Sequence, residues 1–354
     1  MAYSSQLPAD SDPRPRGTIS PDDALPPVEP PSASFILQLF VVPGVIVTII
    51  VLVWLLFNWL AQMGNDPDEY VNAIKRNNEG RWQAAVNLAN ALNNERGPGF
   101  KELRQNKQVV KELSQVLNEE IDDGSMQEKP VMFRMFLCRA IGSFEVPDGL
   151  PVLLKAVETN RGKEEETVRR SALEAIALLA DNVLKAEPKQ RLADPKLEST
   201  LLAATGDADP LIRSSAVFAM GVIGGEPLLA KLRFMTKDSY PDVRYNAATA
   251  LARQGDPAAR DVLLEMIDPD EEAGVKIEEE KGHDFKRALI EFNALRAIGT
   301  LLQVNPQISG EEFVPSLEKL LKRRLPNNVK LEAENVLRTI QKPRSAEKPA
   351  ASAA

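Results

Sequence analysis

The sequence predicts an all-α protein, an α-solenoid of helical pairs preceded by one transmembrane helix and a disordered N-terminal arm. Three observations support this fold class. An uncharged apolar stretch lies near the N-terminus, and apolar residues recur with a period of about 3.6 from residue 66 onward, without a clear strand pattern. A ten-residue frame also returns several times in the second part of the chain, which is typical of a repeat architecture.

The composition removes several classes of protein function. Aromatic residues make up only 5% of the 354 residues, which favours helices over β-sandwiches. The formal net charge is -8, so we expect no nucleic-acid partner. The single cysteine, Cys138, excludes an intrachain disulfide framework, and the single histidine, His283, excludes a histidine-rich metal site. We therefore expect neither a cofactor nor a metal.

Both ends of the chain have the composition of disordered segments. Residues 1–34 contain eight prolines and carry two arginines against five acidic residues. They predict a disordered, partly polyproline-II arm, because so few apolar side chains cannot form a core. Residues 342–354 contain no apolar residue larger than alanine and predict a disordered tail.

The uncharged stretch between Glu29 and Asp66 predicts a transmembrane helix over residues 35–62. Its densest part, residues 41–60, has 14 Leu, Ile, Val or Phe residues and would span about 30 Å as a helix, the thickness of the hydrocarbon core of a bilayer. A buried core helix rarely runs this long without a charge, and a cleaved signal peptide would need an unusually long acidic first region. The residues assigned to the membrane anchor are Val41, Trp54, Trp59 and Leu60.

The distribution of basic residues predicts the orientation of this helix. Three basic residues follow it within 20 positions, whereas one precedes it. By the positive-inside rule we expect a single-pass membrane protein with its C-terminal part in the cytoplasm. The inverted topology, with the C-terminal part outside, is the alternative.

The repeated frame defines one helix of each predicted pair. It reads aliphatic, Arg, two variable positions, Ala, small or apolar, variable, Ala, large, and Gly or Ala. The copies begin at Ile212 and Val243 most clearly, at Phe133, Val168 and Ile290 well, and at Val329 and Gly80 weakly. The second positions from Arg134 to Lys330 cover 196 residues in five steps, a mean near 39.

A second amphipathic stretch follows most copies of the frame. Proline and aspartate often stand just before a helix, as at Asp209-Pro210 and Asp256-Pro257, which are signals for helix starts. One such pair cannot cover its own apolar face, so neighbouring pairs must stack. The second stretches are Leu150–Val157, Lys196–Ala204, Pro227–Met235, Ala258–Ile267 and Phe313–Leu321.

Residues 131–341 resemble the HEAT-repeat family through these frames and the aspartates that precede them. Residues 66–121 form an N-terminal helical region that is only loosely similar, and its Gly80-Arg81-Trp82 turn is also compatible with a TPR-like hairpin. The resemblance implies a ladder of Asp and Arg side chains between repeats. Glu291 and Lys330 depart from the pattern, so the ladder should weaken toward the C-terminus. The residues predicted to form the ladder are Asp209, Arg213, Asp242 and Arg244.

The resemblance also implies where a partner would bind. In HEAT-like arrays the second helix of each pair tends to line the concave side, so polar residues on those helices are the candidates. We expect a membrane-tethered scaffold or assembly factor that binds protein partners beside the lipid bilayer, and not an enzyme. The resemblance to membrane-anchored HEAT proteins implies the bacterial inner (plasma) membrane as its location. A HEAT-like enzyme or accessory subunit, similar to a bilin lyase or a DNA glycosylase, is the alternative. The candidate partner-binding residues are Lys155, Lys231, Arg233, Arg260, Glu265, Lys319, Lys322 and Arg323.

The insertion Asp268–Asp284 is the remaining unusual segment. It holds eight acidic residues, and their spacing weakly resembles that of a calcium-binding loop. Gly274 stands at the seventh position, however, where an EF-hand needs the sixth, so we interpret the segment as a solvated acidic loop.

Overall fold

The computed structural model describes residues 30–63, 67–76, 80–94 and 98–342, and the chain divides into two compact units, residues 1–65 and 66–354. Within the described residues every regular element is a helix, which confirms the predicted all-α class. Most of the predicted disordered arm, residues 1–29, lies outside the described residues. The predicted tail lies outside them from residue 343 onward.

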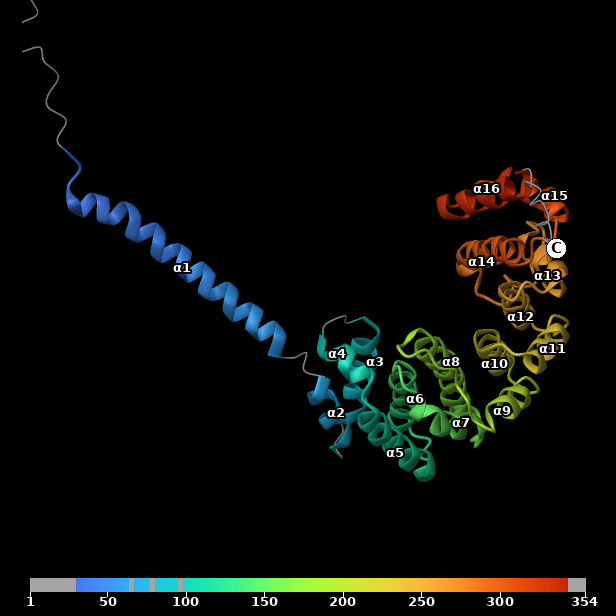
Figure 1. Cartoon of the computed structure of the whole chain (residues 1–354), viewed down its shortest axis with the longest axis horizontal. Helices are drawn as coiled ribbons and strands as arrows, with labels where there is room; N and C mark the ends of the chain where they lie inside the picture. The colour runs from blue at the N-terminus through green and yellow to red at the C-terminus, as the bar shows by residue number, and fades with distance from the viewer. Residues whose placement is uncertain (1–29, 64–66, 77–79, 95–97, 343–354) are drawn as a thin grey trace, which may run out of the picture. The chain divides into compact units, whose positions relative to one another are not determined.

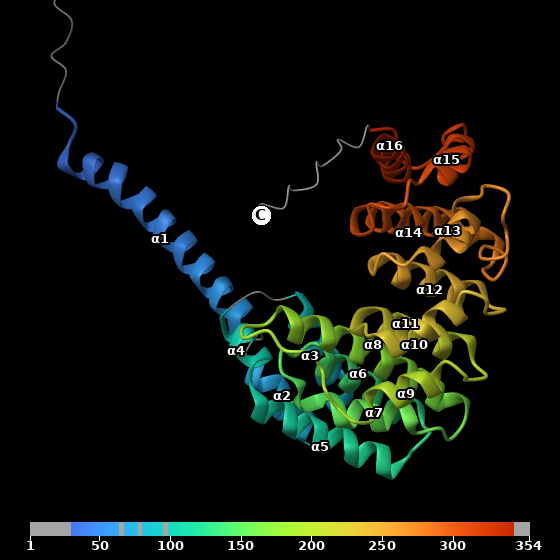
Figure 2. The same cartoon turned by 45° about the vertical axis from the view of Figure 1, so that its right-hand side comes forward.

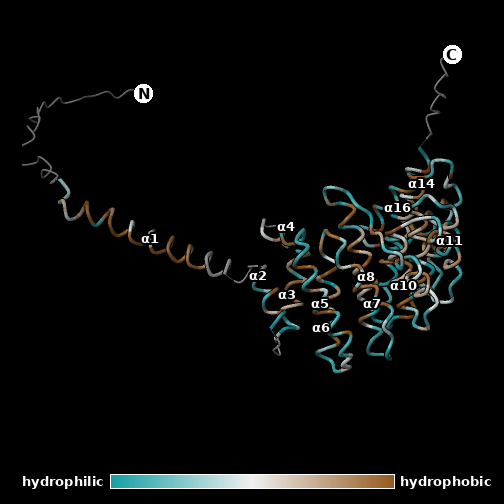
Figure 3. The backbone as a smooth tube through the Cα atoms, turned by 60° about the horizontal axis from the view of Figure 1, so that its bottom comes forward, coloured by the Kyte–Doolittle hydropathy of each residue, from teal (hydrophilic) through white to brown (hydrophobic). Residues whose placement is uncertain are grey.

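The first unit contains one long helix, α1 (Ala33–Met63). Residues 33–57 are long and apolar enough to cross a membrane, and their side chains are exposed in the structure. The tube is brown, the hydrophobic colour, along much of this helix (Figure 3). Among the predicted anchor residues, Val41 is 48% and Trp54 is 65% exposed. Trp59 and Leu60 belong to α1, but their side chains lie outside the description.

The second unit is an array of helices in two rows. Figure 1 shows an inner row of α3, α6, α8, α10, α12, α14 and α16, and an outer row that includes α5, α7, α9, α11, α13 and α15. The bounds are α2 Pro67–Lys75, α3 Arg81–Asn94, α4 Pro98–Arg104, α5 Lys107–Asp123, α6 Glu128–Gly142, α7 Leu150–Glu158, α8 Lys163–Lys185 and α9 Leu197–Ala204. The remaining bounds are α10 Pro210–Ile223, α11 Glu226–Met235, α12 Pro241–Arg253, α13 Arg260–Ile267, α14 His283–Val304, α15 Val314–Leu321 and α16 Asn327–Gln341.

Every predicted frame from residue 133 onward lies in a helix of the inner row. The aliphatic, alanine and large positions of the frames are buried, and they join one continuous core that runs from Val71 to Val336. Each predicted second stretch coincides with a helix of the outer row, from α7 to α15. The stacked helical pairs confirm the predicted α-solenoid. Because the core also includes buried residues of α2–α5, these helices pack as part of the same array.

Small residues at the end of the frame let the inner helices come unusually close. A Cβ placed on Gly142 of α6 would lie 2.7 Å from the Cα of Ala175 in α8. At the corresponding position of α10, a Cβ on Gly221 would lie 2.4 Å from the Cβ of Ala250 in α12. A Cβ atom cannot come this close to another carbon atom, so glycine is required at both positions for the observed distance between the helices.

The inner row lines the concave side of the solenoid, which corrects the expectation that the second helix of each pair does so (Figure 1). Figure 2 gives the same arrangement from another direction, with α12, α14 and α16 in one column and α13 and α15 beside it. The physical reason is the packing just described. Small residues bring the frame helices closer together than their outer partners, so the array curves toward the frames.

The acidic insertion packs against the solenoid instead of standing clear of it. Val275 is buried, and the ammonium of Lys319 donates to Asp268 at 2.9 Å and to Asp270 at 2.6 Å. Among the described residues, no group of three or more His, Cys, Asp or Glu side chains is arranged to hold a metal ion. The insertion therefore ties the loop before α14 to the outer helix α15.

Candidate binding surface

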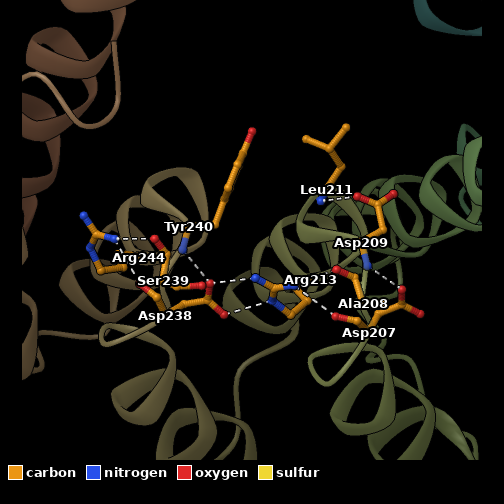
Figure 4. A network of polar contacts seen from close by, with 9 residues as sticks. All are labelled: Asp207, Ala208, Asp209, Leu211, Arg213, Asp238, Ser239, Tyr240 and Arg244. Atoms are coloured by element: carbon orange, nitrogen blue, oxygen red, sulfur yellow. Dashed lines mark hydrogen bonds and ion pairs between the residues drawn. The ribbon is translucent and has the colours of Figure 1, made fainter. Parts of the chain in front are cut away.

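The second position of each frame holds a side chain that links neighbouring segments. Arg213 Nε and Nη2 donate to the two carboxylate oxygens of Asp238 at 2.9 and 2.8 Å, and its Nη1 donates to the Asp207 carbonyl at 3.0 Å (Figure 4). Asp238 lies just before α12, so this bidentate pair joins α10 to the next repeat. A bidentate pair of an arginine and a carboxylate fixes the relative orientation of the two side chains and also stabilises the contact.

The same link recurs along the solenoid. Arg134 lies 3.3 Å from Glu165, and Arg169 Nη2 donates to Asp207 at 2.7 Å. Arg244 pairs with Glu265, on the outer helix of its own pair. At Glu291 the polarity is reversed, because the frame position is acidic and its partner is Arg323, whose Nη1 lies 2.9 Å away.

The structure places two of the predicted ladder residues elsewhere. Asp209 caps α10, where its Oδ1 accepts from the backbone N–H of Leu211 at 2.8 Å. Asp242 accepts from Lys286 of α14 at 3.0 Å. The loop carboxylates that pair with frame arginines are instead Asp207, which accepts from Arg169, and Asp238, which accepts from Arg213.

The charges of this ladder shift the pKa of its members. Burial of Asp238 opposes its charged form, but hydrogen bonds from Arg213 and from the Tyr240 backbone N–H outweigh that effect, and its pKa lies below the ordinary value. The hydrogen bond to Asp238 raises the pKa of Arg213. At Glu291 burial prevails over the nearby Arg323, so its pKa is raised.

Most of the predicted partner-binding residues are used inside the molecule. They lie on or next to outer helices, and six of the eight make intramolecular ion pairs. Those six are Lys155 with Asp122, Arg233 with Glu226 and Asp256, Arg260 with Glu312, Glu265 with Arg244, Lys319 with Asp268 and Asp270, and Arg323 with Glu291. Of the other two, Lys231 lies over the ring of Phe234, 4.8 Å from its centroid.

A different set of side chains lines the concave face. The fourth, seventh and eleventh residues of each frame share one stripe of the helix, opposite the buried stripe. In α12 these are Asn246, Thr249 and Arg253. In α14 they are Asn293, Arg296 and Thr300.

These six residues surround a hollow of about 340 Å³ between α10, α12 and α14. Phe218, the seventh residue of the frame in α10, forms the end of the hollow and is 39% exposed. Asn246 is held in place because its amide donates to Ser214 of α10 at 2.8 Å. The floor is made by Ala250 and Ala297, whose small side chains leave the space open.

A second hollow of about 520 Å³ adjoins the first, between α8, α10 and α12. Phe218 and Arg253 line both hollows, so the two form one continuous depression. Leu178 and Val222 give the second hollow an apolar wall. Its α8 side carries the acidic residues Glu174 and Asp181.

The two arginines of the concave face differ from those of the ladder. Within the described part of the chain, neither Arg253 nor Arg296 forms an ion pair with a carboxylate. Desolvation by the walls of the hollow and the positive charge of Arg296 lower the pKa of Arg253. Two guanidiniums that face a common hollow without a counter-charge form a surface suited to an anionic group.

Sequence reasoning missed these residues although their positions carried a signal. The frame labels positions four and seven as variable, since they are not constrained by the core. A variable position that projects from a stripe flanked by small residues is where a solenoid can present a binding side chain.

Comparison with known proteins identifies the repeat. Residues 197–280 match a family model described as HEAT repeats. No curated protein matches the chain. Similar solved structures include YibA of Escherichia coli, with 19% identity, a TM-score of 0.37, and coverage of 77% of this chain and 96% of that one. An engineered protein has 15% identity, a TM-score of 0.34, and coverage of 78% and 96%.

A third similar structure corrects one expectation. It is human deoxyhypusine hydroxylase in complex with glycerol, with 17% identity, a TM-score of 0.31, and coverage of 79% of this chain and 98% of that one. This neighbour is an enzyme. The expectation that the chain is not an enzyme is therefore wrong, because a fold of helical repeats does not exclude enzymatic activity.

Proposed function

We propose, for a chain that carries HEAT repeats at residues 197–280, that it is a membrane-tethered scaffold or assembly factor whose concave face binds a protein partner. The observation that carries this proposal is the contrast between the two faces. Ladder and outer-helix charges are mostly paired within the molecule, whereas the concave residues Arg139, Glu174, Arg253 and Arg296 form no ion pair with another described residue.

The tether is supported by α1, which is long and apolar enough to span a bilayer. We propose that it holds the solenoid at the bacterial inner membrane, with the solenoid in the cytoplasm. Confinement beside a membrane raises the effective concentration of the concave face toward other membrane components. A weak concave site would then suffice for assembly.

Photo-crosslinking in membranes tests the binding face. A benzoylphenylalanine would replace Thr249 on the concave side, or Phe234 on the outer helix α11, where the native ring is 66% exposed. We expect a crosslinked protein from position 249 and none from position 234. Crosslinks from position 234 alone would contradict the proposal.

One further variant and a protease-protection experiment test the tether and its orientation. Removal of residues 1–64 should release the chain from the membrane fraction and weaken the crosslink at position 249. Protease added to intact spheroplasts should leave the solenoid uncut, and digestion from outside would contradict the cytoplasmic assignment. The full-length chain in permeabilised cells is the control for protease access.

A further inference from the structure

The concave depression changes its chemistry from one end to the other. Its α8 side carries Glu174 and Asp181 with the apolar Leu178 between them in sequence, and α10 adds the apolar Phe218 and Val222. Its α12–α14 end carries Arg253 and Arg296. Asp181 is paired with Lys185 at 2.6 Å. Glu174 at the α8 side and the two arginines at the α12–α14 end are therefore left without an ion pair among the described residues, and positive charge prevails at the α12–α14 end. A ligand that fits it must place negative charge there and an apolar group beside it.

The groups around the arginines suit a polypeptide. The Thr249 and Thr300 hydroxyls donate back to carbonyls of their own helices at 2.9 Å, so their oxygens remain acceptors for N–H groups of a ligand. Asn293 adds an amide that can both donate and accept. A flat bilayer cannot follow a concave surface, whereas an extended chain segment can lie along it.

We propose that this depression binds an extended segment of a partner protein in which an apolar side chain precedes or follows acidic side chains by about four residues. The apolar side chain occupies the hollow walled by Leu178, Phe218 and Val222, and a carboxylate lies between Arg253 and Arg296. This inference rests on the proposed function and adds to it the chemistry of the partner.

The spacing follows from the packing of the inner row. Neighbouring packed helices lie about 8–10 Å apart, so the path from α10 to the space between α12 and α14 is about 15 Å. An extended chain covers about 3.3 Å per residue, and about four to five residues span that path. A carboxylate at this distance also relieves the mutual repulsion of the two guanidiniums, which adds to the larger effect of burial in lowering the pKa of Arg253.

Fluorescence anisotropy on the full-length chain in detergent micelles tests the inference with defined probes. The probe is a fluorescein-labelled peptide, GSLSGSEEGS, and its matched control is GSLSGSQQGS, which has the same size without the carboxylates. We expect the acidic peptide to bind about tenfold or more tightly than the glutamine peptide, and the difference to shrink as salt is raised. A third peptide, GSSSGSEEGS, lacks the apolar side chain and should bind more weakly than the first.

Two variants locate the effect. The double variant R253Q/R296Q should remove the preference for the acidic peptide, and both positions are exposed, so the fold should persist. R139Q is the matched control, because Arg139 holds the same frame position in α6 as Arg296 holds in α14 but lies outside both hollows. It should leave the preference unchanged.

Three results would overturn the inference: equal affinity for the acidic and glutamine peptides, no binding of the acidic peptide at millimolar concentration, or a preference that survives R253Q/R296Q. These are distinguishable from failure of the proposed function. A crosslink from position 249 in membranes without any carboxylate preference rejects only the acidic segment. A carboxylate preference with no crosslink in membranes rejects the scaffold role.

Discussion

Arg134 Nε lies 3.3 Å from Glu165 Oε1, and both side chains are completely buried. This pair joins α6 to the start of α8 inside the apolar core, and Arg134 Nη1 also donates to the Ser125 carbonyl at 2.9 Å. Removing charges from water is costly, so Arg134 depends on the carboxylate of Glu165. Glu165 is compensated by Arg134 and also by Arg161, whose Nη1 lies 3.6 Å from its Oε2.

Replacing one member of this pair should therefore destabilise the solenoid strongly. We expect Glu165→Gln to lower the free energy of unfolding by about 3–5 kcal/mol, since it leaves the buried Arg134 without a carboxylate. Arg134→Met should cost less, since Glu165 keeps Arg161, whose Nη1 lies 3.6 Å from Glu165 Oε2. Urea unfolding followed by circular dichroism measures the loss. The double variant R134M/E165L should recover most of it, and equal losses in the single and double variants would contradict the account.

Asp238 should make the stability of the solenoid dependent on pH. Its folded pKa is lower than the ordinary value of 3.8, so its charged form stabilises the fold above that value, and this contribution is lost as the pH falls through the folded pKa. We expect Asp238→Asn to lower the free energy of unfolding by about 2 kcal/mol at neutral pH. The difference from the native chain should begin to shrink as the pH falls to the ordinary value of 3.8 and should disappear only below the folded pKa.

Asp209 provides the control for that experiment. It caps α10 from the same loop, and asparagine caps a helix about as well as aspartate. Asp209→Asn should therefore leave stability within about 0.5 kcal/mol of the native chain. A large loss there, with none for Asp238→Asn, would restore Asp209 as the ladder residue.

Gly142 and Gly299 should respond oppositely to alanine. At Gly142 a new methyl meets the Ala175 backbone, so Gly142→Ala should cost about 1–3 kcal/mol. At Gly299 the nearest atom to a Cβ is 3.9 Å away, and helix propensity should make Gly299→Ala stabilising by about 0.5–1 kcal/mol. Thermal unfolding of both variants measures the sign, and equal shifts would argue against close packing of α6 on α8.

The thiol of Cys138 should be unreactive in the native protein. Burial raises its pKa to about 12, so almost none is thiolate at neutral pH. We expect iodoacetamide to label it only at the rate of unfolding, and labelling to become fast in denaturant. Rapid labelling without denaturant would mean that α6 opens locally.

The sequence pattern predicted the helices because each core position must be apolar whatever its neighbours are. A position such as Ala216 or Leu251 must be apolar wherever it faces the core, so the frame is visible without the fold. The choice between Asp207 and Asp209 as the partner of a frame arginine depends on the dihedral angles of one loop. Both are acidic and both precede α10, so the sequence does not distinguish them.

The binding surface was harder to predict because curvature is a property of the whole array. Both helices of a pair are amphipathic. Which of the two lines the concave face follows from small differences between the helix-to-helix distances within the two rows. Gly142 and Gly221 carried that information, but only the distance to Ala175 and Ala250 reveals which row is compressed. Arg253 and Arg296, which are 43 residues apart in sequence, then become neighbours on α12 and α14.

The reversed pair of Glu291 and Arg323 limits how this protein can be re-engineered. A consensus drawn from the other repeats would put arginine at position 291, a site that is only 3% exposed and already faces a guanidinium. Averaging would thus bring two like charges together in a place with little water to screen them. Homogenising the array requires changing both positions at once.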